Sequence, residues 1–265
     1  MAKERGWIFF DIDGTLLYAR GVGREAFRQA FDEALGWEQG VEHINFYGAT
    51  DLDVFRNICA ERGETSTPEM EQAFFTHLAP ALDERLAQNT PEVFPNIGNL
   101  LSILSKGWKA TALPDSVLNL HSLGDAGSRF SDTRSSEAWK QNRHPGSSGW
   151  KLGIVTGNIE ATAKLKLKHA GLLDFFDPNG FGCGCDHEDR VQIAHHALER
   201  AGNPKCAVLI GDTPNDINAA KANGMVSIAV ATGGFNFQAL EKTAADHVFE
   251  DLTDTERLLS ILESI

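Results

Sequence analysis

A short apolar segment near the start of the chain, ending in acidic residues, constrains the fold more than any other feature. Residues 6–13 read GWIFFDID, and Gly14 and Thr15 follow. Successive apolar and β-prone positions predict a strand that is buried on both faces, as strands of parallel sheets are. The acidic residues and Gly14 then mark the end of this strand and the start of a loop.

Helices and apolar strands alternate in the second part of the chain. We expect helices over residues 96–105, 160–170, 192–201, 214–222 and 255–262, and strands over residues 150–156, 207–211, 226–231 and 247–250. This alternation predicts an α/β fold with a Rossmann-like parallel sheet. Ligands bind such sheets at the carboxyl ends of the strands, so polar side chains that follow the strands become candidates for a site.

Three amphipathic segments come between the first strand and this alternating part. Residues 25–37, 51–61 and 68–87 carry apolar side chains at helical spacing. Thr67 precedes Pro68, which is typical of an N-cap followed by proline at the first helical position. Several helices in succession, with no strand between them, predict a helical lid placed after the first strand.

Residues 110–148 do not fit either pattern. They are rich in Ser, Gly, Asp and Arg, and the tripeptide Gly-Trp-Lys occurs on both sides, at 107–109 and at 149–151. Removing one copy and everything between joins a helix to a strand through a normal turn. Because long structureless loops are uncommon in compact domains, we interpret the segment as an insertion or a disordered loop. The alternative is a surface loop flanked by a chance repeat.

Charge and composition exclude several classes of function. The net charge of −13 would repel nucleic acid, and no apolar run approaches the ~18 residues of a membrane span. The N-terminus shows no secretory signal, so we expect a cytoplasmic protein without disulfides. Cys183 and Cys185 could suggest a metal clip, but their spacing is too tight for a zinc knuckle and no second pair exists. We interpret them as chance cysteines in a loop.

Asp11 and Asp13 are the strongest chemical signal. One ionised carboxylate can act as a nucleophile, and a second, partly protonated one can act as a general acid toward a leaving oxygen. Two such groups also favour a bound divalent cation, which would attract a phosphate. Taken alone, D-x-D-G-T could also be a turn with an acidic cap.

Two later segments reinforce this interpretation. Residues 156–158 (TGN) end one predicted strand and open a helix, where a hydroxyl and free N–H groups can bind phosphate, although a plain helix cap is the alternative. Asp212 and Asp216 follow another strand, four residues apart. Hard oxygen ligands at a strand end suit magnesium, and the alternative is a cap with a first-turn acid.

The order and placement of these segments resemble the haloacid dehalogenase (HAD) superfamily. Its first motif, D-x-D-G-T, matches at Asp11 and Asp13, its second at Thr156, and its fourth, G-D-x-x-x-D, at Asp212 and Asp216. The resemblance covers the chain except residues 110–148. It implies a HAD-like core of residues 1–17 and 94–265 and a helical cap of residues 18–93.

The resemblance also implies roles for these residues. Asp11 would attack phosphorus to form an aspartyl-phosphate, and Asp13 would protonate the leaving alcohol and then activate water. Thr156 and the N–H groups near Gly157 and Asn158 would hold the phosphoryl oxygens. Mg²⁺ would be bound by Asp11, the backbone carbonyl of Asp13 and Asp212, with Asp216 in support. We therefore expect the carboxylates of residues 11, 13 and 212 to converge on one cation.

The third motif of the superfamily is a cation that neutralises the phosphate, and here the chain departs from the common Lys-Pro form. Arg190 is the best positional candidate, because a guanidinium can grip phosphate oxygens in pairs. The alternatives are Lys164, Lys166 and Lys168, which fit a solvated helix face. Thr50 resembles part of the G-x-T-D segment of phosphoglycolate-phosphatase-like members and is a candidate for substrate binding, with a plain N-cap as the alternative.

The resulting prediction is a magnesium-dependent phosphatase that acts on a small phosphorylated metabolite. A phosphomutase of the β-phosphoglucomutase type shares the motifs and remains a rival. A catalytically silent phosphate- or metal-binding protein is the rival from another class, because residues 110–148 enter just before the strand that ends in Thr156. The sequence leaves the natural substrate and the oligomeric state open.

Overall fold

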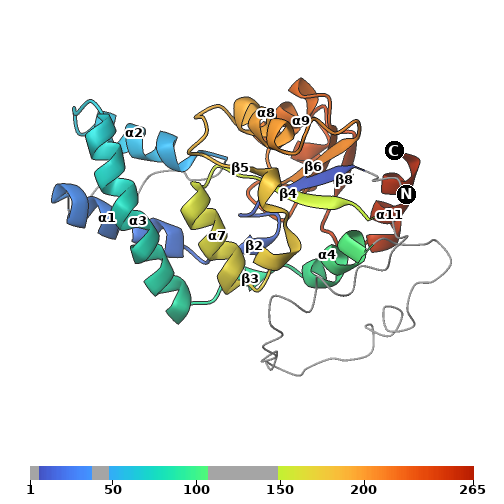
Figure 1. Cartoon of the computed structure of the whole chain (residues 1–265), viewed down its shortest axis with the longest axis horizontal. Helices are drawn as coiled ribbons and strands as arrows, with labels where there is room; N and C mark the ends of the chain where they lie inside the picture. Colours follow the sequence, from blue (N-terminus) through green and yellow to red (C-terminus); the bar gives the residue numbers. More distant parts are fainter. Residues whose placement is uncertain (1–5, 38–47, 107–148) are drawn as a thin grey trace.

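The computed structural model describes residues 6–37, 48–106 and 149–265 (Figure 1). Residues 110–148, which we interpret as an insertion, lie outside the described residues. Within the described part, no helix combines the length and apolar character that crossing a membrane requires.

A parallel sheet of six strands forms the centre of the fold. Its strands, in the order β5-β4-β1-β6-β7-β8, are Phe181–Gly182, Lys151–Val155, Trp7–Phe10, Ala207–Gly211, Val226–Val230 and His247–Phe249. Every neighbouring pair in this sheet is parallel. The first strand of the chain therefore lies between β4 and β6, which places the residues that follow these three strands side by side at one edge.

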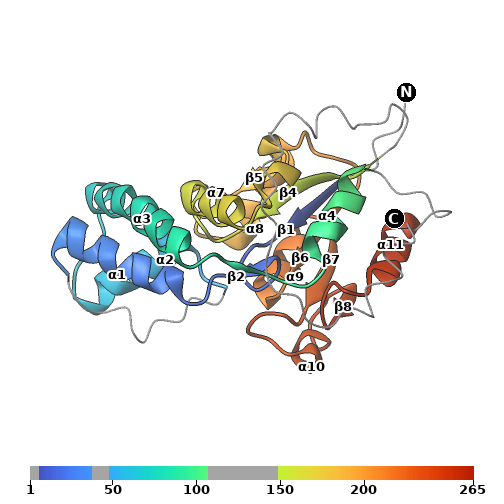
Figure 2. The same ribbon diagram turned by 90° about the horizontal axis from the view of Figure 1, so that it is seen from below.

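Helices cover both faces of the sheet, as Figures 1 and 2 show. The apolar side chains of α4 (Ile97–Lys106), α7 (Glu160–His169) and α11 (Thr255–Ser264) pack on the face that carries Ile8 and Phe10. Those of α8 (Arg190–Arg200) and α9 (Pro214–Ala222) pack on the face that carries Trp7 and Phe9. Because successive strand residues point to opposite faces, the uninterrupted apolar run in β1 serves both layers at once.

A separate helical layer lies beside the sheet (Figure 2). It consists of α1 (Val22–Leu35), α2 (Asp51–Glu61) and α3 (Pro68–Gln88), and it has its own apolar cluster. Phe31 and Phe74, whose ring centroids are 4.3 Å apart, lie at its centre with Phe55. The predicted N-cap at Thr67 is confirmed, since its hydroxyl oxygen accepts the Met70 N–H and Pro68 starts the helix.

An antiparallel pair of two-residue strands connects the helical layer to the sheet. Leu17–Tyr18 (β2) pairs with Glu92–Val93 (β3). The chain enters the helical layer after β2 and returns to the sheet after β3. These two strands and β5 were not predicted from the sequence, because two residues are too few to show a period of two. The one-turn helix Phe237–Leu240 (α10) and the 3₁₀ turns at Leu173–Phe175 and Pro178–Gly180 were not predicted either.

Candidate active site

The ends of three adjacent strands bring the site together. Asp11 follows β1, Thr156 follows β4, and Asp212 follows β6. The Asp11 N–H donates to the Ile210 carbonyl at 2.9 Å, which extends the pairing of β1 with β6 into the site. The predicted meeting of these segments at one edge of the sheet is therefore present in the structure.

Gly14 allows the loop after β1 to press against Asp212. Its φ of +83° lies in the left-handed region, and a Cβ at this position would stand 2.5 Å from Asp212 Oδ2. The Gly14 carbonyl accepts the Thr232 hydroxyl at 2.5 Å, which ties this loop to the one after β7. A side chain at residue 14 would thus strain the backbone and displace a carboxylate of the site.

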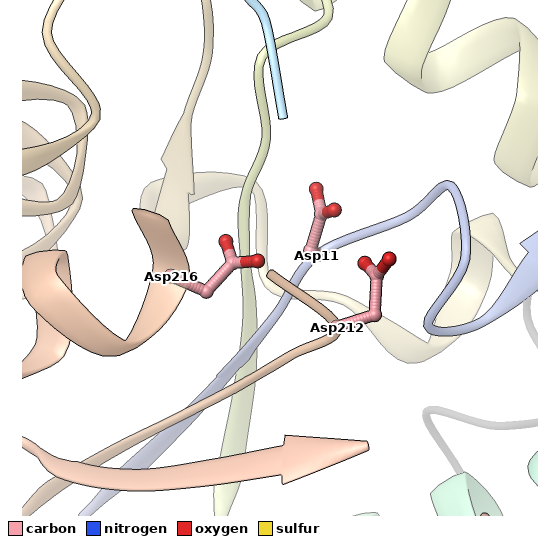
Figure 3. Close-up of side chains that lie close together, drawn as sticks. All are labelled: Asp11, Asp212 and Asp216. Atoms are coloured by element: carbon pink, nitrogen blue, oxygen red, sulfur yellow. The ribbon is translucent and has the colours of Figure 1, made fainter. Parts of the chain in front are cut away.

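Three carboxylates form a buried cluster at the centre of the site. Asp11, Asp212 and Asp216 each offer an oxygen, and these oxygens lie within 4.8 Å of one another. Figure 3 shows the three side chains close together. The Thr15 hydroxyl donates to Asp212 Oδ1 at 3.2 Å and so fixes that carboxylate.

Burial dominates the electrostatics of this cluster. It raises the pKa of Asp11 to about 6, because the loss of solvent outweighs the attraction of Arg190 and because Asp216 and Asp13 add repulsion. Burial, followed by repulsion from Asp11 and Asp216, raises the pKa of Asp212 to about 8. Carboxylates crowded in this way hold their protons until a cation compensates their charge.

The donor set of the cluster fits a magnesium ion. Carboxylate oxygens are the hard ligands that Mg²⁺ selects. Burial raises the pKa values of Asp11 and Asp212 although Arg190 opposes the shift, so a further cation would stabilise the ionised carboxylates. Among the described residues, the cluster contains no Cys or His that would favour a softer metal.

Arg190 supplies the cation nearest to Asp11. Its Nη2 lies 2.8 Å from Asp11 Oδ1 and 2.5 Å from Asp216 Oδ1, and its Nε donates to Asp216 at 3.0 Å. Arg190 is the first residue of α8, and Asp189 caps this helix by accepting the Val191 N–H. The structure thus brings the predicted phosphate-neutralising residue against the predicted nucleophile.

Asp216 is held more completely than the other two acids. Oδ2 accepts the Thr213 N–H at 3.1 Å and the Thr213 hydroxyl at 2.7 Å, and Oδ1 accepts Arg190. These bonds make Asp216 the third-position partner in the capping box of α9. Asp216 therefore both caps α9 and belongs to the acidic cluster.

Asp13 differs from the expected convergence of carboxylates. Its side chain stands outside the cluster, where Oδ2 accepts the Lys166 ammonium at 2.6 Å and the Asn158 side-chain amide at 2.8 Å. The expectation that the carboxylates of residues 11, 13 and 212 meet around one cation is wrong for residue 13. The reason is that a protein cation already pairs with that carboxylate.

The segment 156–158 forms a tight corner next to Asp13. The buried Thr156 Oγ1 accepts the Asn158 N–H at 3.3 Å and its side-chain amide at 2.8 Å. A Cβ on Gly157 would lie 2.5 Å from the Ala49 carbonyl, so the start of α2 packs directly on this corner. The Asn158 side-chain amide donates to Asp13, and its oxygen accepts the Lys166 ammonium.

Thr50 and Asp51 join the helical layer to this corner. The Thr50 hydroxyl accepts the Asp53 N–H at 3.1 Å, so it caps α2, and its predicted contact with substrate stays a prediction. Asp51 donates its N–H to the Gly157 carbonyl, and its Oδ2 accepts the Ile159 N–H at 2.8 Å and the Thr162 hydroxyl at 3.1 Å. Burial raises the pKa of Asp51 to about 6, although Lys166 opposes the shift.

Lys166 lies in a different environment from the one that we expected from the sequence. Lys166 does not lie on a solvated helix face, since only 9% of its side chain is exposed against 45% for Lys164. The buried positions of α7 are Thr162, Ala163, Lys166 and Leu167. Their spacing of three and four is helical, so the periodicity of α7 was the signal that could have placed Lys166 on the inner face.

Comparison with known proteins agrees with this architecture. Residues 190–255 match a family described as HAD-hydrolase-like. The pyrophosphatase PpaX of Bacillus pumilus is 33% identical over 110 residues, which are 40% of this chain and 50% of PpaX. The first curated relatives are therefore matched over half of their length or less. PpaX of Oceanobacillus iheyensis is 23% identical over 251 residues and 93% of each chain.

Two solved structures share the fold over nearly the whole chain. A hydrolase from Pseudomonas syringae superposes with a TM-score of 0.59 and 22% identity, covering 98% of both chains. A haloacid dehalogenase-like protein from Streptococcus pneumoniae superposes with a TM-score of 0.58 and 21% identity, covering 96% of this chain and 97% of its own. The resemblance indicated by the motifs is therefore confirmed, and this chain has the fold of the haloacid dehalogenase superfamily.

Proposed function

We propose that the protein is a magnesium-dependent phosphatase that hydrolyses a small phosphate monoester through an aspartyl-phosphate on Asp11. The observation that carries this proposal is the surrounding of Asp11. Its carboxylate is buried at the end of the central strand, with Arg190 on one side and the acids Asp212 and Asp216 around it. A buried carboxylate between a cation and metal ligands is suited to phosphoryl transfer through a covalent intermediate.

Asp11, Asp212 and the backbone carbonyl of Asp13 would hold the magnesium ion. The ion supplies positive charge that attracts the phosphate dianion and offsets its repulsion from the carboxylates. Asp216 would contribute mainly by fixing Arg190, because both of its oxygens already accept hydrogen bonds from protein groups.

The chain's own residues account for both chemical steps. In the first, a carboxylate oxygen of Asp11 forms a bond to phosphorus while the bond to the ester oxygen breaks and Asp13 gives that oxygen a proton. In the second, Asp13 takes a proton from water, whose oxygen attacks phosphorus and releases Asp11 and inorganic phosphate. Arg190 neutralises the phosphoryl oxygens in both steps, and its guanidinium suits paired contacts.

The corner of residues 156–158 and the helical layer would bind and enclose the substrate. The Thr156 hydroxyl and the backbone N–H groups near Gly157 would hold phosphoryl oxygens. We propose that residues 18–93 act as a cap on a core of residues 1–17 and 94–265. The contact of Ala49 and Asp51 with Gly157 supports this role, because these residues precede and begin the second helix of the helical layer and lie against the corner. A closed cap would exclude water and select the leaving group.

The decisive experiment measures hydrolysis of p-nitrophenyl phosphate with and without Mg²⁺. We expect Mg²⁺-dependent turnover by the unaltered chain and loss to the no-enzyme level in Asp11→Asn, with an unchanged thermal melt. Asp174→Asn, at an exposed aspartate of the 3₁₀ turn, is the matched control and should keep full activity. Appreciable turnover by pure Asp11→Asn protein would contradict the proposed nucleophile.

A panel of phosphorylated metabolites would then identify the substrate class. It should include phosphoglycolate and sugar phosphates, and also pyrophosphate, because relatives named PpaX are pyrophosphatases. A phosphomutase would be recognised by a phosphorylated enzyme that persists and transfers its phosphate to a sugar phosphate. The same assay on a version that lacks residues 110–148 tests the silent alternative. Inactivity of both versions on the whole panel would reject the phosphatase proposal.

A further inference from the structure

Lys166 is a buried ammonium group that the proposed steps above do not use. It sits on the inner face of α7, with 9% of its side chain exposed. A charge is held in such a place only where partners compensate the loss of water. Lys164 and Lys168, on the same helix, lie nearer to solvent, so the burial of Lys166 is specific to its position.

The partners of Lys166 form a closed triangle around Asp13. The Lys166 Nζ donates to Asp13 Oδ2 at 2.6 Å and to Asn158 Oδ1 at 2.7 Å. The Asn158 side-chain amide donates to the same Asp13 Oδ2 at 2.8 Å. Asp13 is thus held by two donors although 42% of its side chain is exposed.

The two buried cations of the site serve different carboxylates. Arg190 pairs with Asp11 and Asp216, whereas Lys166 pairs with Asp13. A cation whose task were to neutralise the phosphoryl group would be expected beside the nucleophile, and Arg190 already lies there. The contacts of Lys166 therefore assign it to the proton-transfer side of the site.

The helical layer fixes the helix from which Lys166 extends. Ile159, the N-cap of α7, has no side-chain cap of its own, and the Asp51 carboxylate accepts its N–H at 2.8 Å and the Thr162 hydroxyl at 3.1 Å. Thr162 lies one helical turn before Lys166 on the same inner face. The start of α2 thereby anchors the first turn of the helix that supplies the ammonium.

We infer that Lys166 is a positioning residue for Asp13, holding that carboxylate through Oδ2 so that Oδ1 carries the proton to and from the substrate. This inference rests on the proposed phosphatase function and refines it. Fixed orientation of an acid contributes most when the leaving oxygen needs a proton. The contribution of Lys166 to kcat/KM should therefore depend on the leaving group of the ester.

The test compares two classes of ester in Lys166→Met, with Lys168→Met as the control on the exposed side of the same helix. An alkyl phosphate accepted by the unaltered enzyme has a poor leaving group that needs a proton, whereas p-nitrophenolate leaves without one. In Lys166→Met we expect kcat/KM to fall about 100-fold for the alkyl phosphate and less than about tenfold for the aryl phosphate. Lys168→Met should leave both values unchanged.

Each outcome has a distinct meaning. Equal losses on both esters would show that Lys166 binds the phosphoryl group, and no loss would show that it has no part in turnover. Either result would overturn the inference while the Asp11→Asn experiment still supports the phosphatase. An inactive unaltered chain would reject both proposals. If Lys166→Met fails to fold, Lys166→Gln replaces it, because glutamine keeps an N–H donor. Its kcat/KM for the alkyl phosphate should fall by less than about 100-fold, and by more than its kcat/KM for the aryl phosphate.

Discussion

Asp11 and Asp13 are two residues apart in the sequence, yet they occupy different electrostatic environments. Asp11 is 10% exposed at its side chain and faces two further acids and Arg190, whereas Asp13 is 42% exposed and faces Lys166 and Asn158. The motif presents both as carboxylates at the end of one strand. These partners come from α7, α8 and the loop after β6, and they hold apart the carboxylate for which we propose nucleophilic attack and the one for which we propose proton transfer.

The largest effect should come from removing the cation on the Asp11 side. Arg190→Met would leave Asp11 and Asp216 as buried acids without their partner, so the free energy of unfolding should fall by roughly 3–5 kcal/mol. Turnover of p-nitrophenyl phosphate should fall by about 10³-fold, as expected for the loss of a charge that stabilises the transition state. Urea unfolding and steady-state kinetics at saturating Mg²⁺ measure the two effects.

Arg190→Lys separates charge from geometry in this comparison. It keeps the positive charge but loses the fork that reaches Asp11 and Asp216 together. We expect it to recover most of the stability and only part of the turnover. Full turnover in Arg190→Met would mean that Lys166 or the metal ion alone neutralises the phosphoryl group. The proposed assignment of Arg190 to Asp11 and of Lys166 to Asp13 would then be wrong.

The surroundings of Asp11 could be predicted from the sequence better than those of Asp13. The strands and the order of motifs placed Asp11, Thr156 and Asp212 at one edge of the sheet, because buried parallel strands leave a strong apolar signal. The surroundings of Asp13 were not predicted, since they depend on which face of α7 turns inward and on how α2 packs against residue 157. Such contacts join segments more than 100 residues apart, and no local pattern encodes them.

A second prediction concerns magnesium and protons on the Asp11 side. Since burial and the neighbouring acids raise the pKa of Asp212 to about 8, the metal-free site is protonated there below that pH. Magnesium must displace this proton, so its affinity should rise about tenfold per pH unit up to about pH 8 and level off above it. Isothermal titration calorimetry at pH 6, 7, 8 and 9 would measure this slope and the proton release.

The same shift predicts how the metal-free protein responds to pH. A folded-state pKa above the unfolded value gives stability that is present at low pH and is lost as pH rises toward about 8, and magnesium should restore it. Asp212→Asn should lose both the affinity and its pH slope. An affinity independent of pH between 6 and 8 would show that Asp212 is not a metal ligand or is already ionised.

The smallest effect is expected where the helical layer meets the Asp13 side. Burial raises the pKa of Asp51 from 3.8 to about 6, so this acid favours the folded state while protonated, and that contribution is lost as pH rises through about 6. The difference amounts to roughly 3 kcal/mol between pH 3 and pH 7, as an upper value before solvent relaxation. Asp51→Asn keeps the shape without the charge, so its stability should change less over this range than that of the unaltered chain.

Asp53→Asn, in the same first helical turn, should follow the unaltered protein. If urea unfolding at the two pH values gave parallel curves for all three proteins, the Asp51 carboxylate would not be confined between α2 and α7 in solution, and the link from the helical layer to Lys166 would lose its physical basis.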